Sequence, residues 1–352
     1  MPNLPITPTT STTYINSAKS NEAETPRMQT TATTDANTGR VGWSPKKSLW
    51  YLCHTLISLF AIIATIRGDL AFSWSALAVF IIFTATTLCL GHSLGMHRRL
   101  IHNSYDCPLW LEYMFVHLGV LVGMAGPLGM MQQHDLRDWA QRQPNCHPYL
   151  RHGNSFLSDG WQQLNYDLLL TNPPIFAPET RVRNDKIYQF MQRTWMWQQL
   201  PWALLLFYFG GISWVIWGIS ARIFVSVTGH WLVGYFAHNT GDRDWHIHNA
   251  ATQGYNIKFA GLISMGESWH NNHHAYPNSA LLGLYQGQTD LGFWVLNALH
   301  NLGLVWNIKL PQHLPHRPER QLLHPSSSDK RVMKTLRPCK YINKPKPTNL
   351  NA

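Results

Sequence analysis

The chain has 352 residues, of which 45% are hydrophobic and only 13% are charged, about half of the charged share of an average soluble domain. The apolar residues are clumped into long runs, which excludes an ordinary soluble class and predicts a membrane protein. The formal net charge is +10, but the basic residues gather outside the apolar runs and no nucleic-acid-binding motif is visible, so we expect a membrane partner and no nucleic acid.

The two ends of the chain are polar. Residues 1–45 are rich in Thr, Ser, Asn and Pro, which predicts a disordered N-terminal tail. Residues 311–352 are rich in Pro, Lys, Arg and His, which predicts a basic, disordered tail that could touch anionic headgroups. One folded domain is therefore expected over 46–310.

Two apolar runs near the N-terminus predict a transmembrane hairpin. Residues 49–66 and 70–90 are each about as long as the roughly 20 residues that span a bilayer, and the turn Arg67-Gly68-Asp69 joins them. Basic pairs lie at both ends of this hairpin: Lys46 and Lys47, and Arg98 and Arg99. The positive-inside rule then predicts that the N-terminus and the segment after the second helix are cytoplasmic.

The second helix leads directly into a segment with three histidines. His97 and His102 are five residues apart, and His92 lies five residues before His97. If the α-helix continues past the membrane, His97 and His102 are about 140° apart around its axis. They could then reach two neighbouring metals.

Residues 108–131 are apolar, yet a third crossing is not expected there. A metal site needs His102 and His134 on the same side of the membrane, and one crossing would separate them. The segment also contains Glu112, and Gly126-Pro127 would bend a helix. We expect an interfacial or re-entrant helix with its bend at Gly126-Pro127.

A second hairpin is expected from residues 199–218 and 223–237, with a turn at Ser220-Ala221-Arg222. It returns the chain to the cytoplasmic side just before His238. The polar residues 148–195 before it predict cytoplasmic helices and loops. Residues 291–304 are apolar but too short to cross, and they predict a surface helix packed on the domain.

Residues 266–277 read Gly-Glu-Ser-Trp-His-Asn-Asn-His-His-Ala-Tyr-Pro. On a helix His270, His273 and His274 stand at i, i+3 and i+4, which is one face. Neutral imidazole is a common ligand of iron, zinc and copper. This spacing therefore predicts a metal site.

Seven histidines lie just cytoplasmic of the expected spans, which is too many for one metal and suits two. They are His97, His102, His134, His238, His270, His273 and His274. The predicted fold is an all-α membrane protein with four transmembrane helices in two hairpins and a cytoplasmic helical cap that holds a di-metal histidine site. Two histidine-bound irons beside a bilayer indicate oxygen chemistry on a lipid chain.

The histidine segments resemble those of a known family. Residues 266–277 resemble the third histidine box of the membrane fatty acyl desaturases, of the delta-9 acyl-lipid or acyl-CoA type found in bacteria and cyanobacteria. The run His97-Arg98-Arg99-Leu100-Ile101-His102 matches their first box, HRxxxH, and the resemblance covers roughly 45–311. It implies two Fe²⁺ ions that use O₂ to place a cis double bond in a saturated acyl chain.

The resemblance also implies partners and a location. Electrons would come from a separate ferredoxin or cytochrome b5-type donor, since no fused heme-binding motif is visible. The acyl chain would be carried by CoA, acyl carrier protein or a glycerolipid. A multi-pass membrane protein with cytoplasmic termini and a cytoplasmic metal site is expected.

The second box departs from the family pattern HRxHH. Here the residues are His134-Asp135-Leu136-Arg137-Asp138. Asp138 can bind iron through its carboxylate. Arg137 cannot, because it stays protonated and has no free lone pair, and it could instead pair with Asp135 or Asp138. An asparagine expected four residues before His238 is replaced by Gly234.

The resemblance, adjusted for these changes, implies two ligand sets. The first would be His97, His134, Asp138 and His273. The second would be His102, His238, His270 and His274, and it lacks one histidine that His92 or His147 could supply.

Two other functions stay open at this point. One is a lipid hydroxylase or oxygenase on the same scaffold. The other is a non-catalytic membrane protein that keeps the fold and binds metal or a partner, which the altered second box suggests. Restoring histidines at positions 137 and 138 separates these ideas.

Overall fold

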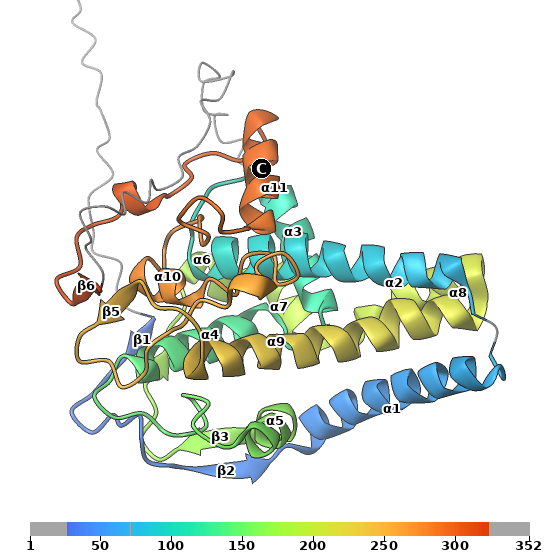
Figure 1. Ribbon diagram of the computed structural model, residues 1–352, viewed down its shortest axis with the longest axis horizontal. Helices are drawn as coiled ribbons and strands as arrows, with labels where there is room; N and C mark the ends of the chain where they lie inside the picture. The colour runs from blue at the N-terminus through green and yellow to red at the C-terminus, as the bar shows by residue number, and fades with distance from the viewer. Residues whose placement is uncertain (1–26, 71, 324–352) are drawn as a thin grey trace, which may run out of the picture.

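The computed structural model describes residues 27–70 and 72–323, which are mostly helical (Figure 1). The α-helices are α1 (Pro45–Arg67), α2 (Trp74–Thr86), α3 (Leu109–Leu121), α4 (Pro127–Gln141), α5 (Phe156–Asn165), α6 (Thr180–Arg183), α7 (Lys186–Thr194), α8 (Gln199–Val215), α9 (Arg222–Asn239), α10 (His270–Ala275) and α11 (Leu291–Asn301). Two π-helical stretches, η1 (Thr87–Ile101) and η2 (Ile216–Ala221), and two 3₁₀ turns, η3 (Lys258–Ala260) and η4 (Pro311–His313), complete the helices. The strands are β1 (Met28–Gln29), β2 (Gly39–Trp43), β3 (Tyr166–Leu170), β4 (Ile175–Phe176), β5 (Trp245–Ile247) and β6 (Arg320–Leu322).

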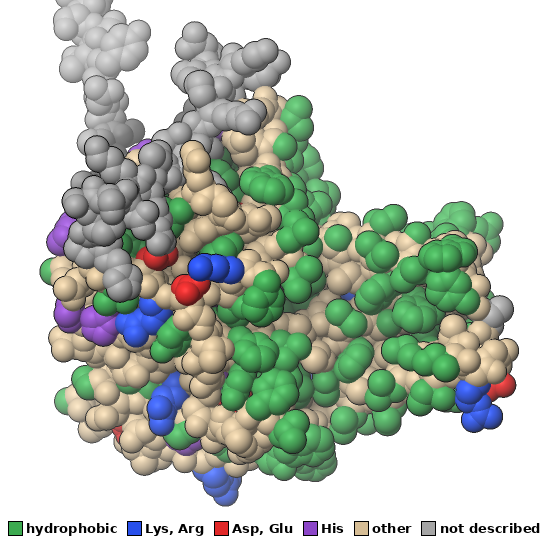
Figure 2. All heavy atoms as spheres, in the orientation of Figure 1, with side chains coloured by type: hydrophobic (Ala, Val, Ile, Leu, Met, Phe, Trp, Pro, Cys, Tyr) green, Lys and Arg blue, Asp and Glu red, His purple; other side chains and the backbone are tan. Residues whose placement is uncertain are grey.

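Three helical stretches are long and apolar enough to cross a membrane: Pro45–Arg67, Trp74–Ile101 and Gln199–Asn239. Together they form an elongated arm that extends away from α10 and the small sheets (Figure 1). Hydrophobic side chains cover this arm, whereas histidines and most charged side chains in this view lie at the other end (Figure 2). An apolar outer surface of this kind suits contact with lipid, and the chain is a membrane protein with a polar cap.

A turn joins the first two apolar helices where one was expected. α1 ends at Gly68, whose left-handed φ of 80° lets its N–H bond to the last carbonyls of the helix, a conformation that glycine adopts without strain. α2 begins after Ser73, whose side chain accepts a hydrogen bond from the Ala76 N–H. The turn Arg67-Gly68-Asp69 is therefore confirmed, with a few more residues before the second helix.

The second helix continues for 28 residues to Ile101, and its last half is π-helical. The His102 N–H donates to the His97 carbonyl at 3.0 Å, which is the i to i+5 bond of a π-helix. One π-turn therefore separates His97 from His102, and both side chains lie on the same side. The expected separation of about 140° is wrong, because it assumed α-helical winding.

The apolar segment 108–131 contains a break where one was expected. α3 ends at Leu121, Gly126 precedes the next helix, and Pro127 is the first residue of α4. α3 runs antiparallel to η1, with Gly91 against Leu118 and Gly95 against the Phe115 carbonyl. Glycine at both positions lets the two backbones approach each other closely.

This close approach gives a first prediction. A Cβ atom on Gly91 would lie 2.3 Å from the carbonyl carbon of Leu118, whereas one on Gly229 of α9 would meet nothing within 4 Å. We expect Gly91→Ala to destabilise the protein by about 1–3 kcal/mol or more, because backbone must move. Gly229→Ala is the matched control and should be neutral or slightly stabilising. Thermal unfolding in detergent measures both, and equal midpoints for the two variants would contradict this packing.

The stretch Gln199–Asn239 is 41 residues long and is interrupted at Gly211, where φ is 64° and ψ is −161°. The residues on the two sides of Gly211 lie next to each other. A Cβ atom on Gly218 would be 2.7 Å from Leu206 Cδ1, and Arg222 Nη2 donates to Gln199 Oε1 at 2.6 Å. The chain therefore reverses at Gly211.

The expected turn at Ser220-Ala221-Arg222 is wrong. Arg222 lies inside the helical stretch and is only 1% exposed. Its guanidinium donates to the carbonyls of Gly218 and Leu121 as well as to Gln199. These acceptors satisfy the buried guanidinium, so the arginine can lie inside a helix. From the sequence alone it indicated a polar turn.

The predicted N-terminal tail is wrong for residues 27–44. β1 pairs with β4, and β2 pairs with β3 in an antiparallel register that joins Gly39 to Leu170 and Trp43 to Tyr166. Arg27 also binds Asp135, with Nε 2.7 Å from Oδ2. Backbone pairing of this kind needs few apolar side chains, so composition did not reveal it. Residues 1–26 lie outside the described residues.

The predicted C-terminal tail is wrong for residues 311–323. β6 pairs with β5, and two arginines of this segment hold the end of α10. Arg317 donates to the His274 carbonyl at 3.1 Å, and Arg320 donates to the Ala275 carbonyl at 3.0 Å. The basic residues of this segment therefore cap the C-terminus of α10. Residues 324–352 lie outside the described residues. The expected surface helix at 291–304 is confirmed as α11.

Candidate metal centre

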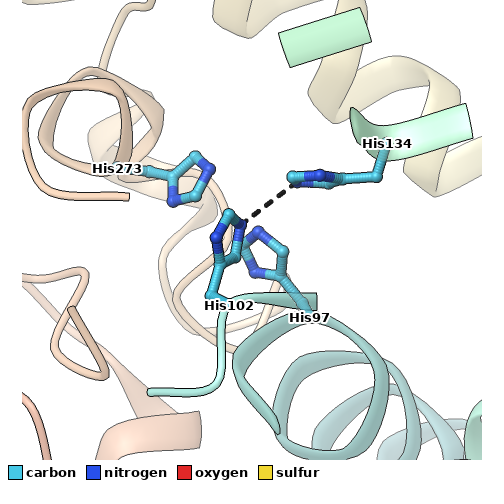
Figure 3. Close-up of side chains that lie close together, drawn as sticks. All are labelled: His97, His102, His134 and His273. Atoms are coloured by element: carbon cyan, nitrogen blue, oxygen red, sulfur yellow. Dashed lines mark hydrogen bonds between the residues drawn. The ribbon is translucent and has the colours of Figure 1, made fainter. Parts of the chain in front are cut away.

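Four histidines from three separate elements form a first group (Figure 3). His97 and His102 come from the end of η1, His134 from α4 and His273 from α10. Their ligand nitrogens all lie within 4.8 Å of one another, and the Nε2 atoms of His102 and His134 are 3.3 Å apart. These imidazoles point inward toward one another, which is the arrangement of a metal site.

Three further histidines form a second group: His238 at the end of α9, and His270 and His274 of α10. The Nε2 atom of His270 is 3.2 Å from that of His238 and 3.0 Å from that of His274. The ring centres of His273 and His274 are 6.1 Å apart. α10 thus contributes to both groups, and the two groups are neighbours.

The structure changes the expected division of the ligands. His102 belongs with His97, His134 and His273, and not with His238. The π-helical winding of η1 causes this, because it turns His102 to the side of His97. The other six histidines are divided as expected.

The two asparagines of α10 hold the short helix in place from its opposite face. Asn271 accepts from the Trp245 N–H at 2.8 Å and donates to the Gly254 carbonyl at 2.9 Å. Asn272 donates to the Leu282 carbonyl at 2.8 Å. A helix of six residues cannot support itself, so these buried bonds fix the direction of the three histidines.

The two arginines of the first box anchor the end of η1. Arg98 donates to Asp290 at 2.8 Å, and both side chains are buried. Arg99 donates to Glu112 of α3 at 2.7 Å. These bonds tie η1 to the loop before α11 and to α3, and they keep both arginines away from the metal-binding side.

Glu267 orients His97. Its Oε2 atom lies 2.6 Å from His97 Nδ1, and its Oε1 atom accepts from Ser93 Oγ at 2.6 Å. Burial opposes ionisation of Glu267, but the charges of His97 and Arg98 outweigh burial and lower its pKa. A carboxylate on Nδ1 leaves Nε2 to face the group, as in many metal-bound histidines.

Nearby aspartates raise the pKa of His134, but burial favours the neutral form of most of the other histidines. It lowers the pKa values of His102, His270 and His273 well below 6.5 and that of His274 to about 4. A neutral imidazole offers the lone pair that a metal needs. Both ring nitrogens of His273 are buried with no hydrogen-bond partner among the described residues, which is costly unless a metal binds there. These donors fit iron or zinc.

Asp138 lies one helical turn after His134, and Arg142 Nη2 donates to its Oδ2 at 3.2 Å. It falls outside both compact groups. Burial opposes its ionisation, but His134 and Arg142, and more weakly His273 and His274, lower its pKa. The Asp138 carboxylate is therefore within electrostatic range of histidines in both groups.

Arg137 is turned away from both aspartates. Its Nη1 atom is 2.9 Å from the Leu150 carbonyl and 2.9 Å from His152 Nε2, and its Nη2 donates to Gln163 at 3.0 Å. The expected pairing with Asp135 or Asp138 is wrong, because Arg27 and Arg142 already bind them.

His152 was missed in the sequence. Its ring is stacked on that of His238, with centres 5.4 Å apart, and its Nδ1 atom is 2.8 Å from Asp159 Oδ2. A Cβ atom on Gly234 would be 3.1 Å from His152 Nε2. The missing side chain at position 234 therefore makes room for His152.

Neither suggested replacement ligand reaches the metal-binding atoms. His147 accepts from the Tyr149 N–H at 3.2 Å, and His92 packs edge-on against His230 with ring centres 5.0 Å apart. Both lie outside the two groups. The side chain found beside the second group is Gln141, whose Oε1 atom is 3.1 Å from His238 Nε2. Its spacing of seven residues from His134 on α4 is the signal that could have identified it.

No family model matches the chain, but curated proteins do. It is 32% identical over 268 residues to the sn-1 stearoyl-lipid 9-desaturase of Anabaena variabilis, covering 75% of this chain and 93% of that protein. It is 32% identical over 258 residues to the enzyme of the same name from Synechocystis sp., covering 73% and 78%. Delta-9 acyl-lipid desaturase 1 of Arabidopsis thaliana is 28% identical over 284 residues, covering 79% and 90%.

Proposed function

Because the chain belongs to the fatty acyl desaturase family, we propose that its two histidine groups hold two iron ions that serve O₂-dependent desaturation. The protein is an oxidoreductase that acts on fatty acyl chains. The observation that carries the proposal is the convergence of seven buried or half-buried imidazoles in two adjacent groups.

Iron is favoured over zinc because the reaction needs electron transfer, and zinc has no redox chemistry. When bound, the irons would supply the redox chemistry that lets O₂ take two hydrogen atoms, each with its electron, from the acyl chain; two further electrons and two protons come from outside, and O₂ ends as two waters. The external electrons would come from a ferredoxin or a cytochrome b5-type protein.

The protein's own residues would hold and orient the metals. The proposed ligands are His97, His102, His134 and His273 for one iron, and His238, His270 and His274 for the other, with Asp138 as a further candidate. Glu267 fixes the ring of His97 through Nδ1. The asparagine bonds of α10 fix the three rings of that helix, so that their geometry is set before O₂ arrives.

The reversal at Gly211 supports four crossings in two hairpins, since it divides the 41-residue stretch into two arms. α1 begins, and η1 ends, at the end of the molecule that carries α10 (Figure 1). The basic pairs Lys46/Lys47 and Arg98/Arg99 favour a cytoplasmic position for that end. Since β-strands and caps extend the folded region at both ends, we propose one desaturase domain over 27–323.

For the carrier we propose a glycerolipid. Two of the relatives described above are named for stearoyl-lipid substrates, and the exposed apolar arm would keep the protein in the membrane where such lipids are. Other relatives are named for CoA substrates, so the analysis of products must separate the two carriers.

The test is expression in a host that lacks this activity, together with a ferredoxin. We expect new cis-monounsaturated chains on intact glycerolipids before they appear on CoA. Purified protein should hold two irons, chelation should abolish product formation, and iron but not zinc should restore it. A hydroxylated product without a double bond would instead support a hydroxylase. Retained metal without any product would support a non-catalytic protein.

A further inference from the structure

We propose that Gln141 is the fourth protein ligand of the second metal, bound through its amide oxygen Oε1. This inference rests on the proposed function, because it assumes that the second group of histidines holds a metal. It goes further by assigning a ligand that lies outside the histidine boxes. It also gives the second group, which has one histidine fewer than the first, a fourth protein ligand.

The direction of the Gln141 amide is fixed by its surroundings. The side chain is 1% exposed, and its Nε2 atom is 2.9 Å from the Leu150 carbonyl oxygen. A carbonyl oxygen can only accept a hydrogen bond, so the NH₂ group must face Leu150. The amide oxygen must then face His238 Nε2, which is 3.1 Å away.

The tautomer of His238 is fixed in the same way. Its Nδ1 atom is 2.7 Å from the Gly234 carbonyl oxygen, which again can only accept. Nδ1 therefore carries the hydrogen, and Nε2 of the neutral ring carries a lone pair. The same Nε2 atom is 3.2 Å from His270 Nε2.

Two acceptors thus face each other across 3.1 Å with no hydrogen between them. Lone pairs of Gln141 and His238 at this distance repel, and both side chains are buried from water. A cation that both lone pairs can bind removes the repulsion. His270 and His274 face the same point with their Nε2 atoms, so the cation would have three imidazoles and one amide oxygen around it, a reasonable set for a divalent metal.

The neighbouring residues explain why the ligand is Gln141. Arg137 points away to His152 and Gln163, and His152 occupies the space beside Gly234. Neither position 137 nor position 234 can therefore supply a ligand to the metal. Gln141 lies on α4 seven residues after His134, which returns it to about the same face of the helix.

The alternative is that Gln141 only accepts a hydrogen bond from a protonated His238 and binds no metal. The two roles of Gln141, metal ligand or hydrogen-bond acceptor, predict different results when Gln141 is replaced. As a ligand, its loss should remove the second metal. As a hydrogen-bond partner, its loss should leave the metal content unchanged.

The experiment compares Gln141→Leu with Gln133→Leu, an exposed position on the same helix. Full-length protein is loaded with ⁵⁷Fe²⁺ in detergent, and iron per chain and the Mössbauer spectrum are measured without any substrate. We expect two irons and two signals for the wild type and for Gln133→Leu. Because loss of a ligand costs more than the roughly 10- to 100-fold typical of a residue that only orients one, Gln141→Leu should bind its second iron more than about 100-fold more weakly or lose it, with one signal remaining.

Two further variants protect the test against misfolding. Gln141→Asn keeps the amide but shortens it by one methylene, so it should also weaken the second site. Gln141→Glu keeps an oxygen at the metal and should retain two irons. Unfolding temperatures of the metal-free proteins show whether each variant folds.

The outcomes separate this inference from the proposed function. Two irons with unchanged affinity and an unchanged spectrum in folded Gln141→Leu or Gln141→Asn would overturn the assignment of Gln141 alone. A wild-type protein that binds no metal would overturn the proposed function and this inference with it.

Discussion

Replacing His273 with alanine is expected to abolish desaturation and to remove the metal of the first group. His273 is 1% exposed, and both of its ring nitrogens lack hydrogen-bond partners among the described residues. It lies between the two groups, with its ring centre 4.7 Å from that of His97 and 6.1 Å from that of His274. Loss of a residue that only orients a ligand typically costs about 10- to 100-fold in affinity or activity, so loss of a ligand should cost more than about 100-fold.

The measurement is the amount of unsaturated fatty acid formed in the expression host, together with iron per purified chain. His248→Ala is the matched control, because His248 is exposed on the loop after β5 and lies outside both groups. It should keep wild-type activity and iron. Because His273 satisfies no other group, His273→Ala should leave the metal-free protein as stable as the wild type, within about 1 kcal/mol. Product formation by His273→Ala near the wild-type level would contradict a metal-binding role.

The third histidine box could be predicted from sequence because its information is local. Three histidines at i, i+3 and i+4 share a face in a helix of six residues, whatever surrounds it. The asparagines between them point the other way and bind the supporting loops. This short pattern therefore specifies both the face that carries the histidines and the asparagine bonds that hold the helix in place.

The first box was harder to interpret, because its geometry depends on the winding of a long helix. The residues of η1 do not themselves indicate a π-helix, and the spacing of His97 and His102 fits two metals in an α-helix but one metal in a π-helix. Close packing of Gly91 and Gly95 against α3 accompanies that winding. The contact joins residues 20 or more positions apart, so the sequence alone could not decide between an α-helix and a π-helix.

Buried polar residues misled the prediction of the second hairpin. Arg222 looked like a turn residue, although three acceptors from α3, α8 and η2 satisfy it inside the protein. Gly211, which does form the turn, stands beside another glycine in an apolar run and gave no polar signal. Burial of a charge with its partners can be recognised only once the partners are located.

The second box shows the largest gap between sequence and structure. Read alone, Arg137 suggested a damaged site. In the fold it joins Leu150, His152 and Gln163, and His152 in turn fills the space left by Gly234. Changes at positions 137 and 234 thus compensate each other through a third residue. Such a coupled set indicates a site adapted to its own ligands rather than one that has decayed.

Restoring the family residue with Arg137→His is therefore expected to lower activity. The substitution removes the hydrogen bonds from the guanidinium to Gln163 and His152 and leaves their part-buried acceptor atoms without a donor. Each unsatisfied buried group costs about 1–3 kcal/mol, so the region around His238 should loosen. A shift of about 1 Å in a catalytic group can cost about 100-fold in rate. We expect desaturation to fall about 10- to 100-fold, even though a potential ligand has been added.

The matched control is Arg193→His, an exposed arginine on α7, which should leave activity and stability unchanged. Product formation and the unfolding midpoint of the metal-free protein are measured for both variants, because the loss of buried hydrogen bonds must appear in the midpoint as well. The double variant Arg137→His with Asp138→His extends the test to the whole second box. A gain of product or of bound iron in either histidine variant would mean that the natural residues impair the site. That result would favour the non-catalytic alternative, whereas a joint loss of activity and stability would mean that Arg137, His152 and Gly234 form part of the working enzyme.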